Sequence, residues 1–84
     1  MSLTTIEDHI LADYVRYKAA HTGQNPAEIV PQINRDEFYE RIYTLHGQFM
    51  AGEFSLGYMA KLLDITKPDL YHLLDAMQLK VTNI

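Results

Sequence analysis

Hydrophobic residues recur at helical spacing in the first part of this 84-residue chain. Intervals of four, four and three residues separate Ile6, Ile10, Tyr14 and Tyr17. This spacing places the four side chains on one face of an amphipathic helix. Thr4 and Glu7 have the spacing of a capping box at its start, and Gly23 is a usual residue after a helix end. The pattern therefore predicts a first helix from Thr4 to just before Gly23.

A short second helix is predicted after this glycine, because Asn25 can cap a helix whose first residue is Pro26. Pro31 limits this helix to one or two turns, since proline removes a backbone donor and clashes with the preceding turn. We expect Ile29 and Val30 to anchor it.

Three more helix starts are marked by the capping residues Asn34, Ser55 and Thr66. The helix after Asn34 has an apolar face and ends near Gly52; this face is formed by Phe38, Ile42, Leu45 and Phe49. The last two helices are shorter, and their apolar residues are Met59, Leu62, Leu63, Leu70, Leu73, Leu74 and Met77. The tail from Lys80 has β-branched residues and predicts a short strand or a loose end.

These elements predict an all-α fold with a single helical domain over residues 1–84. A hydrophobic content of 48% is ample for a folded core. The chain has no cysteine, so neither a disulfide framework nor a thiolate metal site is available. Because the chain has no apolar run long enough to span a membrane and its first residues do not have the pattern of a signal peptide, we expect a cytoplasmic protein without a membrane partner.

Residues 55–78 have the pattern of a helix-turn-helix, in which a small residue lies where two short helices touch and apolar residues fill their shared core. Ala60 is the small residue, and the apolar positions are Leu63, Ile65, Leu70 and Leu73. Asp64 occupies a turn position where glycine is usual, because the backbone there tends to need a positive φ that aspartate tolerates better than most residues. An ordinary helical hairpin without a ligand remains the alternative.

The segment Gly52–Thr66 adds a resemblance to this pattern. Its Ser55-Leu56-Gly57 start, followed by Ala60 and the Leu62-Leu63 pair, resembles an uncharacterised family of small prokaryotic antitoxin-like proteins. The resemblance covers about residues 38–82. It implies a C-terminal helix-turn-helix, DNA binding in transcription regulation, and a toxin as a protein partner. Residues 1–34 differ from the family, whose members tend to begin with a strand.

The predicted DNA-binding residues lie on or beside the last two helices: Ser55, Lys61, Thr66, Lys67, Tyr71 and His72. The net charge is −4, but residues 55–84 are neutral, with three lysines against three aspartates. Phosphate contacts normally dominate DNA affinity, so this small set of cations predicts weak binding by the protein alone. Tyr71 and His72 suit a protein partner equally well, because aromatic residues are enriched in interface cores. A helical interaction module is therefore the competing function.

No catalytic motif or cofactor site is expected. The four histidines lie on separate elements, and Asp69, His72 and Asp75 on one helical face more simply form a solvated surface than a metal site. Glu7-Asp8 and Asp36-Glu37 lie in or beside first helical turns, where the helix dipole favours negative charge. The chain is therefore not expected to be an enzyme.

Four tyrosines lie at helical spacing on the two longer helices: Tyr14, Tyr17, Tyr39 and Tyr43. They either fill the rim of the core or form the seam of a homodimer, since tyrosine is favoured at interfaces. We expect a homodimer, because the chain is short and a two-fold dimer is the commonest closed assembly.

Overall fold

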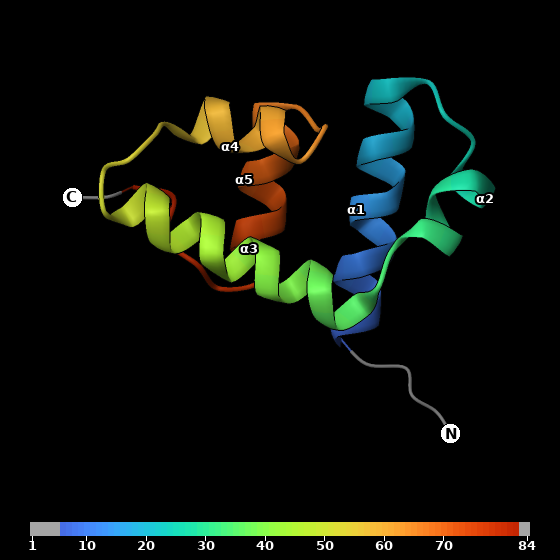
Figure 1. Cartoon of the computed structure of the whole chain (residues 1–84), viewed down its shortest axis with the longest axis horizontal. Coiled ribbons are helices and arrows are strands. Elements are labelled where there is room, and N and C mark those ends of the chain that lie inside the picture. The colour runs from blue at the N-terminus through green and yellow to red at the C-terminus, as the bar shows by residue number, and fades with distance from the viewer. Residues whose placement is uncertain (1–5, 83–84) are drawn as a thin grey trace.

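The computed structural model describes residues 6–82, all of whose regular elements are helical. The expected all-α fold is confirmed for this part of the chain (Figure 1). The elements in chain order are α1 (Ile6–Thr22), α2 (Pro26–Ile29), the 3₁₀ turn η1 (Val30–Gln32), α3 (Arg35–Met50), α4 (Leu56–Leu62) and α5 (Lys67–Ala76).

Side-chain caps begin four of these helices, at the residues that the sequence predicts. Asn25 and Glu28 form a capping box on α2, and the Asn34 side chain accepts a hydrogen bond from the Glu37 amide at 3.0 Å. The hydroxyls of Ser55 and Thr66 accept in the same way at the starts of α4 and α5. Each cap satisfies a backbone donor that the first turn of a helix leaves open. The capping box expected at Thr4 lies outside the described residues.

One expectation about local structure is wrong. Val30 was expected to anchor the second helix, but its side chain is 57% exposed, and only Ile29 is buried there. Val30 is the first residue of η1 and lines an open apolar pocket with Leu11, Ala12 and Val15 of α1, so its side chain stays exposed to solvent while Ile29 is buried. Of the two alternatives expected for the C-terminal tail, the structure agrees with the loose end: from Leu79 to Thr82 the described chain is irregular and has no strand.

Helix α3 extends along one side of the molecule, with α4 and α5 packed over its C-terminal half (Figure 1). Helix α1 contacts both α5 and α2, so the first long helix of the chain lies beside the last. Helix α2 and η1 extend outward on the far side of α1 (Figure 1).

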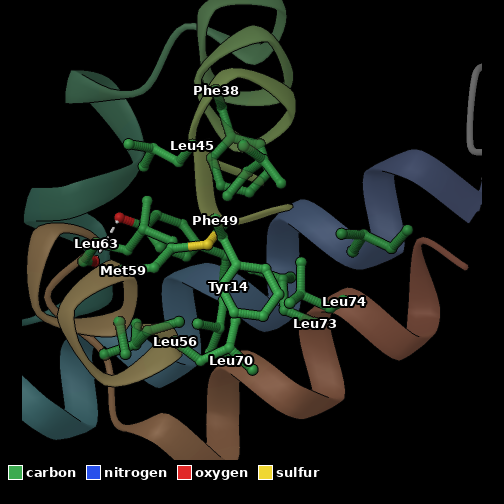
Figure 2. Close-up of a cluster of buried hydrophobic side chains, with 14 residues drawn as sticks. Tyr14, Phe38, Leu45, Phe49, Leu56, Met59, Leu63, Leu70, Leu73 and Leu74 are labelled. Carbon is green, nitrogen blue, oxygen red and sulfur yellow. Dashed lines mark hydrogen bonds between the residues drawn. The ribbon is translucent and has the colours of Figure 1, made fainter. Parts of the chain in front are cut away.

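The core lies where α1, α3, α4 and α5 meet, and Figure 2 shows its side chains converging. Its most deeply buried members are Ile42, Met59, Leu63, Leu70, Leu73 and Leu74. No polar or charged residue of the described part is buried. Apolar burial therefore drives the packing of these helices. Within the same residues, no helix is long and apolar enough to cross a membrane.

Candidate partner-binding surface on α4 and α5

Helices α4 and α5 pack against each other and are joined by the four residues 63–66. Asp64 has a φ of 60°, as the sequence predicts for this turn position. The Ile65 amide donates to the Ala60 carbonyl at 3.1 Å, which closes the turn onto α4. Ala60 is only 2% exposed, so its methyl group is enclosed in the core. The turn and the packed helices fix which α5 residues face outward.

Four of the six predicted binding residues lie within these helices, and all four are exposed: Lys61, Lys67, Tyr71 and His72. The other two, Ser55 and Thr66, are the N-caps, and their hydroxyl oxygens accept from the amides of Tyr58 and Asp69 at 3.2 Å each. Each hydroxyl keeps its own O–H as a donor. Ser55 is exposed and Thr66 is half-buried, so Ser55 is the more accessible donor.

A surface hollow brings Ser55, Lys67 and Tyr71 together at the start of α4, the exposed side of α5 and the C-terminal tail. The other residues that line it are Phe49, Phe54, Leu56, Val81 and Thr82. Within it, the Lys67 ammonium lies 5.9 Å from the centre of the Tyr71 ring, a cation–π distance. Lys61, Thr66 and His72 do not line this hollow. The hollow therefore groups Ser55, Lys67 and Tyr71, whereas the other three predicted residues lie outside it.

The charge on this surface is mixed. Lys67 is the one charged residue that lines the hollow, and Lys61 is exposed on α4. Asp75 is exposed near the end of α5, where a carboxylate repels an anionic partner. The surface therefore offers two lysines and several hydroxyl or ring donors to an anion.

Three residues outside α4 and α5 contact the turn that joins these helices. The sequence pattern does not predict this role for them. The Tyr14 hydroxyl donates to the Leu63 carbonyl at 2.9 Å, and the Arg41 guanidinium donates to the Leu62 carbonyl at 2.8 Å. The Lys18 ammonium lies 3.9 Å from the Asp64 carboxylate. These contacts bring together residues from α1, α3 and the turn, and no spacing pattern in the sequence indicates them.

Tyr14 is therefore a core residue with a polar role, not part of an exposed seam. It is 5% exposed, and its ring packs on Phe38 with 4.7 Å between ring centres. Burial raises the pKa of the Tyr14 hydroxyl, Arg41 lowers it and Asp64 raises it, with burial the largest of the three causes. The hydroxyl consequently stays protonated and able to donate to Leu63. Of the four tyrosines, Tyr43 is the one that is mostly exposed, at 54%.

The described histidines lie apart from one another. His9 pairs with Asp13 at 3.3 Å, whereas the His46 ring lies 2.8 Å from the Lys80 carbonyl and fastens the tail to α3. Among residues 6–82, no group of three histidine or acidic side chains is placed to hold a metal ion. Comparison with known protein families, with curated proteins and with solved structures gives no match to this chain.

Proposed function

We propose that this protein is a small DNA-binding regulator of the antitoxin-like type, in which α4, the turn and α5 form a helix-turn-helix. The observation that carries the proposal is the pairing of two short packed helices across a four-residue turn, with Lys67, Tyr71 and His72 exposed on the second helix. In DNA-binding proteins with this motif, the second helix enters the major groove and its side chains contact base edges.

The exposed residues have complementary roles in this proposal. Lys61 and Lys67 contact phosphates, and the hydroxyls of Ser55 and Thr66 donate to the DNA backbone. Tyr71 and His72 lie further along α5, where they face base edges. Because phosphate contacts supply most of the affinity, two lysines give weak binding to a single copy.

A homodimer compensates for this weak binding by presenting two α5 helices to one site. Its support is the outward face of α3, where Tyr43 is 54% exposed. Gly47 follows one helical turn later, and a Cβ atom built there meets nothing within 4 Å. We propose that two copies meet at this open face, with the Tyr43 rings as its aromatic anchors. Sedimentation at micromolar concentration is expected to give about twice the chain mass; a monomer would exclude this arrangement.

The DNA proposal is tested by titrating labelled DNA from upstream of the protein's own gene at several salt concentrations. Replacing Lys61 and Lys67 with alanine should lower the slope of log affinity against log salt by about two. The matched control is Arg16→Ala with Arg35→Ala, which removes the same charge from α1 and the start of α3. Absence of binding by the unmodified protein at low salt would rule out the proposal, and an equal loss in the control would show a mere net-charge effect.

Asp75→Asn separates local from overall electrostatics in the same titration. The amide keeps the shape of the side chain but removes a negative charge from the exposed end of α5. Binding should become tighter if DNA lies along this helix. The same substitution at Asp36, on the exposed start of α3, serves as the control and should have a smaller effect.

A protein-interaction module is the second candidate, and the hollow between α4, α5 and the tail favours it. Four of its eight lining residues are apolar and Tyr71 adds an aromatic ring; Tyr71 is 39% exposed, and Tyr58, outside the hollow on α4, is 50% exposed. Buried aromatic anchors commonly dominate the binding energy of protein interfaces. Co-purification with the product of the neighbouring gene, lost on Tyr71→Ala and retained on Tyr43→Ala, supports this function and assigns the partner to the hollow.

A further inference from the structure

Two carbonyls at the C-terminal end of α4 accept hydrogen bonds from side chains of other helices. The last carbonyls of a helix have no partner within it. At α4, the Leu62 carbonyl accepts from Arg41 of α3 and the Leu63 carbonyl accepts from Tyr14 of α1. Two different long helices thus provide donors to two consecutive carbonyls at the point where the chain turns toward α5.

A third contact reaches the next residue of the same turn. Lys18, one helical turn after Tyr14 on α1, lies 3.9 Å from the Asp64 carboxylate. Tyr14, Lys18, Arg41 and Leu63 also line one surface pocket, so the contacts converge on one place. Asp64 itself has a positive φ, a conformation that single non-glycine residues adopt only with support from their surroundings.

We propose that Tyr14 and Arg41, assisted by Lys18, are positioning residues that set the orientation of the α4–α5 pair relative to α1 and α3. This inference rests on the proposed function for its consequence: the presentation of Lys67, Tyr71 and His72 to a partner depends on residues that do not touch the partner. Tyr14 and Lys18 belong to the N-terminal part of the chain, which lies outside the resemblance to antitoxin-like proteins, whereas Arg41 of α3 lies within it.

The geometry explains why these contacts determine orientation as well as stability. Leu62, Leu63 and Asp64 are consecutive, and the side chains that hold them come from two helices and from separate directions. Removal of the Tyr14 hydroxyl leaves the ring packed on Phe38, because that contact involves the ring alone. The Leu63 carbonyl then loses its donor from α1, and of the three side-chain contacts described above the Arg41 bond and the Lys18 pair remain.

The test measures orientation directly. The chain has no cysteine, so Thr44→Cys on α3 and His72→Cys on α5 allow two spin labels to be attached at exposed positions only. The distribution of label distances is recorded for the otherwise unmodified protein, for Tyr14→Phe, and for Tyr14→Phe with Arg41→Met. The control is Tyr17→Phe, a half-buried tyrosine of the same helix for whose hydroxyl no hydrogen bond occurs among the described residues.

We expect a broader or shifted distance distribution in Tyr14→Phe, a larger change in the double variant, and none in Tyr17→Phe. Circular dichroism establishes that each variant is folded at the temperature of measurement; if the double variant is unfolded, Tyr14→Phe alone decides. A lower melting temperature of Tyr14→Phe with an unchanged distribution would overturn the inference, because the bond would then only stabilise the fold.

The functional readout is DNA binding by protein that carries neither the cysteine substitutions nor the spin labels. Tyr14→Phe should weaken binding by about fivefold, the low end of typical coupling between distant sites, and leave its salt slope unchanged, since no phosphate contact is lost. Unchanged affinity would contradict the functional part of the inference. Failure of the unmodified protein to bind DNA would count against the proposed function alone, because the label distances report on orientation without any DNA.

Discussion

The substitution Ala60→Leu tests the packing between α4 and α5 most directly. Ala60 lies in the last turn of α4, is 2% exposed, and accepts backbone hydrogen bonds from Leu63 and Ile65 at 3.1 Å each. The larger side chain has no path to solvent from this position. It must either displace α5 or distort the turn that follows.

The expected cost follows from the volume added. Leucine replaces one methyl hydrogen of alanine with an isopropyl group, and overpacking of this kind destabilises a core by about 1–3 kcal/mol. Leucine and alanine have similar helix propensities, so the backbone of α4 contributes little to the difference. For a domain of this size each kcal/mol lowers the melting temperature by about 4–8 °C. The variant should therefore melt about 4–24 °C below the unmodified protein.

Thermal unfolding followed by circular dichroism at 222 nm measures this difference. The matched control is Ala20→Leu, which adds the same group at an exposed position of α1 and should change the midpoint little. An Ala60→Leu midpoint equal to that of Ala20→Leu would show that Ala60 does not lie at a tight contact between helices, and the packing described for α4 and α5 would be wrong.

Three further predictions follow from single residues. Asp64→Val should lower the free energy of unfolding by about 1–2 kcal/mol in a urea titration, because a β-branched residue fits poorly at a φ of 60°; an unchanged value would contradict the positive φ. Gly47→Ala should raise it by about 0.5–1 kcal/mol, since a methyl group there meets nothing within 4 Å, and a loss of stability would reveal an unseen contact. Burial raises the pKa of Tyr14, so its contribution to stability should be fully present below the unfolded value of about 10 and lost as the pH rises through the folded value; the alkaline loss should be smaller in Tyr14→Phe, and an identical pH profile would refute this assignment.

The local structure could be predicted from the sequence because it depends on neighbouring residues. Asn25, Asn34, Ser55 and Thr66 each satisfy an amide two or three positions away. The positive φ at Asp64 likewise follows from the shape of a short turn between two helices. The exposure of Val30 was missed because the path of the chain after Ile29 depends on how α2 meets α1.

The site was predicted only in part, for a related reason. Exposure of Lys61, Lys67, Tyr71 and His72 follows from the apolar face of each helix. The hollow also needs Val81 and Thr82, whose position depends on the path of the tail. The donors to the turn depend on the approach of α1 and α3, and Tyr14 lies 49 positions from the carbonyl that it binds. Such contacts arise from tertiary packing and leave no spacing pattern.

The position of α1 beside α5 has a consequence for the order in which the protein assembles. Helices α3, α4 and α5 are consecutive, so their contacts close short loops, whereas α1 must find a surface formed by residues far along the chain. Closing a longer loop costs more entropy, and contacts of high sequence separation form late. Helix α1 should therefore dock last and detach first, as a unit with α2. In hydrogen exchange, amides of α1 should exchange through partial openings that leave α3–α5 protected.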